Sequence, residues 1–133
     1  MPLAMSILGH GIDLIECARI ASLLDRHRDR FLDRLLTPAE RTYVERHRNP
    51  VPRIAGRFAA KEAVLKVLGT GWHGRITWRD IEIRNDPAGR PEVHLSGECA
   101  IIAGRIGIDS VLISITHTDT YAAASAIGLA KPN

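Results

Sequence analysis

Two carboxylates and two lysines are the residues of this chain best suited to chemistry. Residues 57–66 form a helical pattern that contains Lys61, Glu62 and Lys66. On a helical projection Lys61 falls inside the apolar arc and Glu62 near its edge, where an unpaired charge is costly to bury. The chain has only three lysines, and two of them lie in this segment. Because an ammonium group is a compact point charge that suits phosphate, both lysines are candidates to bind one.

Asp13 is the second carboxylate, and it follows a short apolar segment next to Gly11 and Ile12. Together with Glu62 it could hold Mg²⁺, an ion that typically takes one or two protein carboxylates and completes its coordination with water and substrate phosphate. Simpler interpretations also exist, since Asp13 could cap a helix and Glu62 could pair with Lys66 four residues later. The sequence alone leaves both alternatives open.

Two further segments carry residues that can contact phosphate. The triplet Gly69-Thr70-Gly71 lacks the Gly-Lys-Ser/Thr ending of a Walker motif and follows a predicted helix C-terminus, where the helix dipole repels anions. A helix C-cap is therefore the simpler interpretation. His117 lies among hydroxyl-bearing residues between two predicted strands, where a structural or solvated histidine is the common case. No Gly-x-Ser-x-Gly elbow or Ser-His-acid order indicates a hydrolase.

The first predicted helix offers a basic surface. Arg19, Arg26 and Arg30 fall within about 40° of one another on a helical projection, beside its apolar arc. Arg34 lies near the same side. A solvated basic face is the common interpretation of such a pattern, but arginines beside apolar side chains also suit an acidic helix of a partner protein.

The hydrophobic pattern predicts helices in the first half of the chain and antiparallel strands in the second, which indicates an α+β fold. Predicted strands cover residues 6–12, 81–84, 92–95, 111–116 and 121–127. Predicted helices cover residues 16–35, 38–48, 54–68 and 96–106. Thr37 and Glu40 have the spacing of a capping box, and Gly69 has the position of a C-cap. We expect one domain over residues 1–133.

Composition excludes several classes of protein. The 45% hydrophobic and 25% charged residues are typical of a soluble globular domain, and no run approaches the roughly 20 apolar residues of a membrane span. Residues 1–9 lack the pattern of a signal peptide, so we expect a cytoplasmic protein without a membrane partner. Cys17 and Cys99 lie far apart without metal-site spacing, and we expect both to be buried apolar side chains.

The charge balance is mildly basic, with a net charge of +3. An acidic protein or an anionic small molecule is therefore a plausible partner. The aromatic residues make up 5% of the chain and do not cluster, so they offer no stacking platform for bases. We expect no nucleic-acid partner.

Taken together, three segments resemble the holo-acyl-carrier-protein synthase branch of the phosphopantetheinyl transferases. The segments are residues 11–20, residues 57–66 with Gly69-Thr70-Gly71, and residues 114–118. Their order, their separation and the total length all match. The resemblance implies an α+β fold assembled as a homotrimer with active sites between subunits. It also implies coenzyme A as donor, a serine of acyl carrier protein as acceptor and a role in fatty acid biosynthesis.

The resemblance also implies roles for individual residues. Asp13 and Glu62 would hold Mg²⁺ against the pyrophosphate while Lys66 approaches the phosphate under attack. Glu62, directly or through a metal-bound water, would accept the serine proton as 3′,5′-ADP departs. The positions matching the coenzyme A site are Arg57, Gly69, Thr70, Gly71, His117 and Thr118, to which residue type adds Lys61 and Lys66. The positions matching the carrier-protein contact are Arg19, Arg30 and Arg34, to which the helical projection adds Arg26.

Two other functions are compatible with some of these residues. A non-catalytic basic module that binds nucleic acid or acidic protein would use the arginines without metal. It leaves Asp13, Glu62 and Lys66 unexplained. A different metal-dependent phosphotransfer enzyme or nuclease would use the two carboxylates and leave the arginines without a role.

Overall fold

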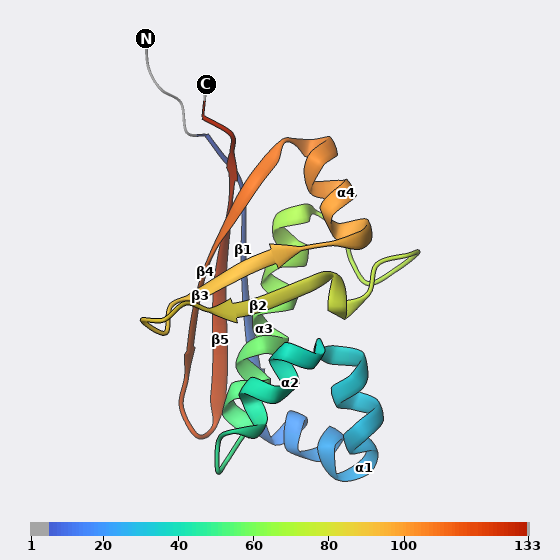
Figure 1. Cartoon of the computed structure of the whole chain (residues 1–133), viewed down its shortest axis with the longest axis vertical. Coiled ribbons are helices and arrows are strands. Elements are labelled where there is room, and N and C mark those ends of the chain that lie inside the picture. The colour runs from blue at the N-terminus through green and yellow to red at the C-terminus, as the bar shows by residue number, and fades with distance from the viewer. Residues whose placement is uncertain (1–5, 133) are drawn as a thin grey trace.

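The computed structural model describes residues 6–132, which form an α+β arrangement (Figure 1). A three-stranded antiparallel sheet has the strand order β1-β5-β4. Its strands are β1 (Ile7–Glu16), β4 (Ile108–His117) and β5 (Tyr121–Ala130). The antiparallel hairpin of β2 (Ile81–Asn85) and β3 (Pro91–Leu95) forms a separate two-stranded sheet. The signal-peptide expectation concerns residues 1–9, of which 1–5 lie outside the described residues.

Four helices lie within the described residues, and two of their ends are where capping residues predict. The helices are α1 (Cys17–Leu35), α2 (Pro38–Glu45), α3 (Val51–Leu68) and α4 (Gly97–Ile106), with a 3₁₀ turn η1 (Trp78–Asp80) before β2. The capping box of α2 is confirmed, because the Thr37 hydroxyl accepts from the Glu40 backbone N–H and the Glu40 carboxylate accepts from the Thr37 N–H. Gly69 ends α3 in the left-handed region, at φ 73°, as a C-cap glycine does.

Several boundaries differ from the sequence prediction: α2 ends at Glu45 instead of 48, β4 covers Ile108–His117 instead of 111–116, and β5 continues to Ala130 instead of 127. Strand β1 does not stop at residue 12 but continues to Glu16, because β5 supplies pairing partners as far as Tyr121. Helix α3 begins at Val51 instead of residue 54. The prolines at its start do not prevent this, since the first turn of a helix has N–H groups without intrahelical acceptors. The turn η1 was not predicted.

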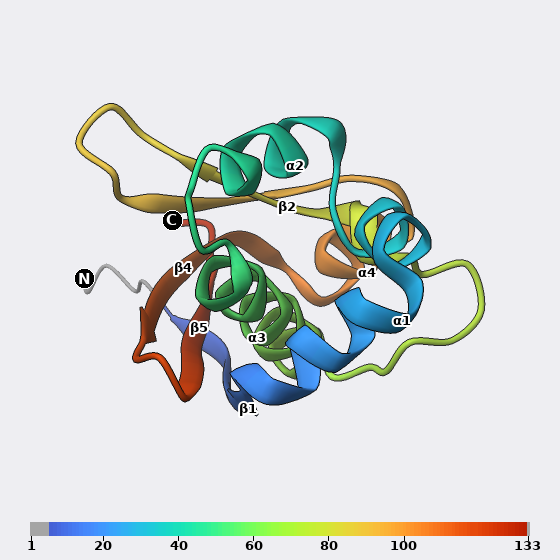
Figure 2. The ribbon, with the colours of Figure 1, turned by 90° about the horizontal axis from the view of Figure 1, so that it is seen from below.

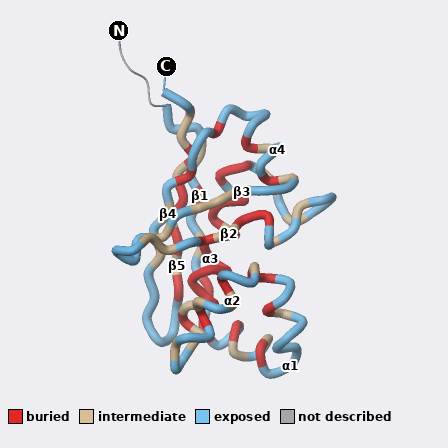
Figure 3. Tube along the Cα trace, in the orientation of Figure 1, coloured by how far each residue is buried: buried red, intermediate tan, exposed pale blue. Residues whose placement is uncertain are grey.

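Helix α3 lies at the centre of the molecule, with the sheet on one side, the hairpin on another and α1 on a third (Figure 2). Its residues are buried over most of its length (Figure 3). The close approach of β1 depends on glycine: a Cβ atom on Gly11 would lie 2.1 Å from the carbonyl oxygen of Ala63. This contact fixes β1 against the second half of α3.

Helix α1 is kinked at His27, which has φ −145° and ψ 39°. A straight helical projection therefore does not hold across residue 27. The kink separates Arg19 and Arg26 from Arg30 and Arg34, although all four side chains are exposed. The predicted single stripe of arginines is corrected to two exposed groups on the two arms of α1.

The two cysteines and the helix lengths bear on two further predictions. Cys17 and Cys99 are both buried free thiols, as expected. Burial raises the pKa of the Cys99 thiol to about 12, so it is not a reactive thiolate. Within residues 6–132, no helix is both long and apolar enough to cross a membrane.

Candidate active site

Asp13 lies inside β1, opposite Ala124 of β5. Side chains alternate along a strand, so Asp13 shares with Gly11 the face that meets α3. There the Lys66 ammonium donates to an Asp13 carboxylate oxygen at 3.4 Å and to the Ile12 carbonyl oxygen at 2.7 Å. The interpretation of Asp13 as a helix cap is wrong, because Glu16 holds the N-cap position of α1.

Glu62 lies one turn before Lys66 on α3 and is half-buried. Its Oε1 accepts a hydrogen bond from the indole Nε1 of Trp72 at 3.1 Å. Within the described part of the chain, Lys66 pairs with Asp13 and not with Glu62. The alternative interpretation of a simple Glu62–Lys66 surface pair is therefore wrong.

The Lys66 ammonium therefore lies against Asp13, and it keeps an N–H group that can donate to a ligand. Lys66 has three N–H donors, of which two contact β1, and its side chain is 52% exposed. In the described residues no donor contacts Oε2 of Glu62. These groups can meet a phosphate from solvent without first breaking a buried interaction.

The carboxylates of Asp13 and Glu62 suit Mg²⁺ better than a metal ion whose ligands all come from the protein. Among residues 6–132, no group of three or more His, Cys, Asp or Glu side chains is arranged to hold a metal ion. Asp13 and Glu62 supply two carboxylates at most. Two carboxylates are what Mg²⁺ takes where substrate phosphate and water complete its octahedron, whereas a structural zinc site needs four protein ligands.

Lys61 does not belong to this cluster. Its side chain is 0% exposed, and its ammonium donates to the Leu35 carbonyl at 2.6 Å, to Glu40 Oε1 at 2.7 Å and to the Trp78 carbonyl at 3.2 Å. All three N–H donors are used, so none remains for a ligand. Burial lowers the pKa of Lys61, although Glu40 opposes this effect. The prediction that Lys61 binds the cofactor is corrected: it ties α1, α2 and η1 to α3.

Glu40 is the buried partner of Lys61, whereas its spacing in the sequence indicates only a capping residue. Besides its two contacts at Oε1, its Oε2 accepts from the Ile83 N–H at 3.0 Å. Arg57 Nε lies 3.8 Å from the same oxygen, too far for a hydrogen bond. The capping-box spacing located Glu40, but nothing in the pattern of the chain indicated its distant partners.

Arg57 points toward the hairpin instead of toward Asp13. Its Nη2 donates to Asn85 Oδ1 at 2.8 Å, and its guanidinium lies 4.3 Å from the ring centroid of Tyr43. Burial lowers the pKa of Arg57. With His117 at the end of β4, Arg57 lines a small cavity of about 160 Å³, which we call the hairpin cavity. Its other lining residues are Tyr43, Pro52, Arg53, Gly56, Asn85, Gly89, Pro91 and Ile115.

The remaining coenzyme A candidates lie on two loops. The loop after α3 carries Thr70, whose hydroxyl contacts His73 Nε2 at 2.9 Å, and the exposed Gly71. Thr118 stands in the β4–β5 turn, where its hydroxyl accepts from the N–H groups of Thr120 and Tyr121. Within one chain, the candidates therefore fall into two groups: Lys66 with the loop after α3, and the hairpin cavity with the β4–β5 turn that follows His117.

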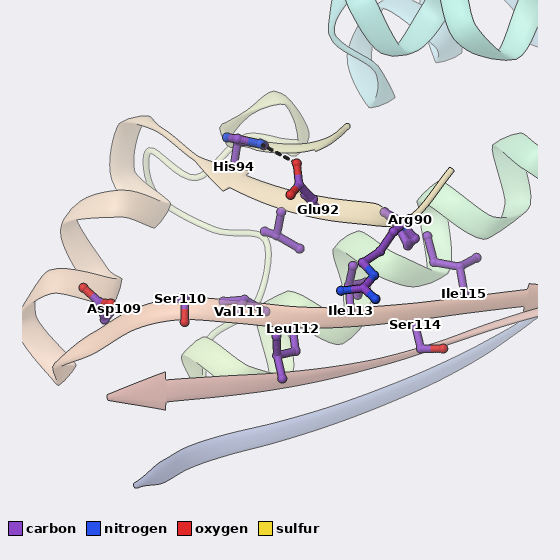
Figure 4. Close-up of a pocket in the computed structure, with 12 residues that line it drawn as sticks. Arg90, Glu92, His94, Asp109, Ser110, Val111, Leu112, Ile113, Ser114 and Ile115 are labelled. Atoms are coloured by element: carbon purple, nitrogen blue, oxygen red, sulfur yellow. Dashed lines mark ion pairs between the residues drawn. The ribbon is translucent and has the colours of Figure 1, made fainter. Parts of the chain in front are cut away.

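A larger cleft of about 700 Å³ lies between β3 and β4 (Figure 4). It shares Pro91 and Ile115 with the hairpin cavity, and Arg90 extends across it toward β4 (Figure 4). His94 and Glu92 face one another on β3 at 4.0 Å. We call Asp13, Glu62 and Lys66 the candidate reaction centre, and none of the three lines this cleft.

The arginines of α1 lie beside apolar side chains. The Arg19 guanidinium lies 5.5 Å from the centroid of the Phe58 ring, over its face. Arg34 lines a depression with Leu23, Phe31 and Leu35. Basic groups beside apolar side chains can receive a helix that combines acidic and apolar residues.

Comparison with known proteins identifies the family of this chain. Residues 9–124 match the 4′-phosphopantetheinyl transferase superfamily. The holo-[acyl-carrier-protein] synthase of Koribacter versatilis (strain Ellin345) is 47% identical over 121 residues, which cover 91% of this chain and 97% of that protein. The chain therefore belongs to the 4′-phosphopantetheinyl transferase superfamily, in its holo-[acyl-carrier-protein] synthase branch.

Solved structures support the same assignment. A holo-(acyl-carrier-protein) synthase from Bacillus anthracis str. Ames in complex with CoA (3′,5′-ADP) has a TM-score of 0.79 at 37% identity, covering 96% of this chain and 100% of that chain. The Helicobacter pylori holo-[acyl-carrier-protein] synthase in complex with coenzyme A has a TM-score of 0.79 at 33% identity, covering 90% of this chain and 98% of that chain. The predicted α+β fold class is confirmed.

Proposed function

We propose that this protein transfers 4′-phosphopantetheine from coenzyme A to a serine of an apo-acyl carrier protein and releases 3′,5′-ADP. The observation that carries the proposal is the contact of Lys66 with Asp13, because an ammonium and a carboxylate then lie together and the second carboxylate, Glu62, is one helical turn from Lys66. The names of the relatives point to the same reaction. The proposed setting is the cytoplasm, in fatty acid biosynthesis, with the transferase domain spanning residues 1–133.

The chemistry follows from these groups. The serine oxygen forms a new bond to the β-phosphorus of coenzyme A, and the bond from that phosphorus to the bridging oxygen breaks. Lys66 offers its remaining N–H to the phosphate under attack, and Glu62, directly or through a water, accepts the serine proton. Held by Asp13 and Glu62, Mg²⁺ would neutralise negative charge on the pyrophosphate. The nucleophile belongs to the carrier, so this chain needs none of its own.

We further propose that the active site is completed by a second copy of the chain in a homotrimer. Two observations support this. Arg57 and His117 lie at the hairpin cavity, which Asp13, Glu62 and Lys66 do not line. The face of the sheet opposite α3 exposes apolar side chains, among them Ile12 at 61% and Leu14 at 65%. A neighbouring subunit could cover this face, and its own hairpin cavity would then lie near Asp13, Glu62 and Lys66 of the first subunit.

Analytical ultracentrifugation at micromolar concentration tests the assembly. We expect a trimer. A fully active monomer would contradict a site that is shared between subunits.

The carrier protein is proposed to dock on α1, where Arg19, Arg26, Arg30 and Arg34 are exposed. Attraction between opposed charged patches mainly steers association and sets the register of the two proteins. Coenzyme A would bind separately, through the residues around Lys66 and the hairpin cavity.

Intact-mass measurement tests the proposed reaction. The chain is incubated with coenzyme A, Mg²⁺ and an apo-acyl carrier protein, and the carrier should gain the mass of one phosphopantetheine group. A control without Mg²⁺ should show no gain. A carrier that stays unmodified while the chain binds it would favour a non-catalytic basic module, and cleavage of coenzyme A without transfer would favour a different metal-dependent enzyme.

A further inference from the structure

Trp72 makes a contact with the reaction centre that neither the proposed chemistry nor the sequence motifs account for. It lies in the glycine-rich loop after α3, and its indole Nε1 donates to Glu62 Oε1 at 3.1 Å. A loop side chain needs support to hold such a bond in place. Trp78 of η1 supplies this support, because the two indoles stack with centroids 3.7 Å apart and an interplanar angle of 25°.

The support for Trp72 continues into the core. Trp78 also packs on Phe58 of α3, with ring centroids 4.8 Å apart. The carbonyl oxygen of Trp78 accepts a hydrogen bond from the buried Lys61 ammonium at 3.2 Å. Stacking on Trp78 therefore holds the Trp72 indole N–H at Glu62. Trp78 is in turn held by Phe58 and by Lys61, which forms a buried ion pair with Glu40.

We propose that Trp72 is a positioning residue that fixes the orientation of the Glu62 carboxylate. This inference rests on the function proposed above. A half-buried glutamate on a helix samples several rotamers, and a hydrogen bond at Oε1 selects among them. Oε2 then stays free for the ion or for the serine proton, and Oε1 keeps a second lone pair. Carboxylates that bind metals are commonly held by such outer hydrogen bonds, whose loss typically costs about 10–100-fold in affinity or activity.

A matched pair of substitutions separates this role from ordinary packing. Trp72→Phe keeps an aromatic ring on Trp78 but removes the N–H that reaches Glu62. Trp78→Phe reduces the same stack but leaves the Trp72 N–H in place. Loss of packing affects both variants, whereas loss of the hydrogen bond affects Trp72→Phe alone.

Calorimetric titration with Mg²⁺ provides the readout. Each variant is saturated with coenzyme A and contains no carrier protein, so there is no turnover. We expect Mg²⁺ affinity to fall by about 10–100-fold in Trp72→Phe and by less than about threefold in Trp78→Phe. In turnover assays, kcat of Trp72→Phe at fixed Mg²⁺ should fall while the KM for the carrier protein stays unchanged.

Fluorescence gives a second test that does not depend on how well Trp72→Phe folds. Because the chain has two tryptophans, Trp78→Phe leaves Trp72 as the single emitter. Adding Mg²⁺ to this variant, already saturated with coenzyme A, should change its emission, since the charge beside the indole changes. The further substitution Glu62→Gln should abolish that change.

The outcomes distinguish this inference from the proposed function. If wild-type protein transfers phosphopantetheine and binds Mg²⁺ but the two variants bind Mg²⁺ equally well, Trp72 is only a packing residue. Tighter Mg²⁺ binding by Trp72→Phe, or an unchanged Trp72 emission, would also overturn the inference. If wild-type protein itself neither transfers the group nor binds Mg²⁺ with coenzyme A, the proposed function fails and this inference fails with it.

Discussion

The two lysines of α3 lie five residues apart and have opposite environments. Lys61 faces the centre of the fold and gives its three N–H groups to Leu35, Glu40 and Trp78. Lys66 faces β1, is half exposed and, among the described residues, donates hydrogen bonds only to Ile12 and Asp13. A cation with all its donors used by the protein is structural, whereas a cation with a free donor at the surface can receive a ligand.

The two glutamates beside these lysines differ in the same way. Glu40 is fully buried, and its carboxylate accepts from Lys61, Thr37 and Ile83. Glu62 is half-buried and accepts from Trp72 alone in the described residues. The number of satisfied lone pairs therefore separates the structural carboxylate from the one that we assign to catalysis. Three experiments can break or sharpen this comparison.

The largest effect should follow loss of a carboxylate at the reaction centre. In Asp13→Ala or Glu62→Ala, the transfer rate should fall by at least about 10²–10³-fold, because charge on the pyrophosphate is no longer compensated. Intact-mass assays of the carrier protein measure the rate. Circular dichroism and sedimentation should show an unchanged fold and assembly. Near-normal turnover at low Mg²⁺ in either variant would show that the carboxylate is not part of the reaction centre.

The same substitution at the two lysines should give opposite results. Lys61→Met should destabilise the fold by about 3–5 kcal/mol, because the buried Glu40 loses its hydrogen-bonded cation and keeps only Arg57, at 3.8 Å, as a positive neighbour. Lys66→Met should change the free energy of unfolding by less than about 1 kcal/mol, because the Asp13 pair is partly exposed, yet it should lose most transfer activity. Urea unfolding measures the stabilities.

The double variant Lys61→Met/Glu40→Gln is the control for the buried pair. It removes the buried Glu40 charge, but it also takes the carboxylate away from the buried Arg57, so only part of the lost stability should be recovered. If the two single variants were equally stable, the contrast between a structural and a functional lysine would be wrong.

The smallest effect should come from the arginines of α1. Arg30→Glu should raise the KM for the carrier protein by about tenfold, which corresponds to about 1.4 kcal/mol, through like-charge repulsion. The KM for coenzyme A should stay unchanged. Arg105→Glu, on the exposed surface of α4, is the matched control and should affect neither value.

Salt provides a further check on the same surface. Wild-type activity should weaken as salt is added, because exposed charges are screened within about 10 Å at 0.1 M ionic strength. A defect of Arg30→Glu in the coenzyme A titration, with a normal carrier titration, would show that the carrier docks elsewhere.

Local features were predictable from the sequence. Thr37 and Glu40 identified the start of α2, Gly69 marked the end of α3, and the position of Lys66 one turn after Glu62 follows from helix geometry. These features depend on residues three to five positions apart, and backbone geometry fixes their separation. The resemblance to a family added the roles of residues on other segments.

The partners of each charge were decided by the tertiary structure. Asp13 and Lys66 are 53 residues apart in sequence, Lys61 and Glu40 are 21 apart, and both pairs form where packing brings separate elements together. A helical period can place Lys61 on an apolar face, but it cannot show that the Glu40 carboxylate packs against that face. The same type of side chain is structural at position 61 and available for chemistry at position 66, because burial and the supply of acceptors depend on which elements surround it.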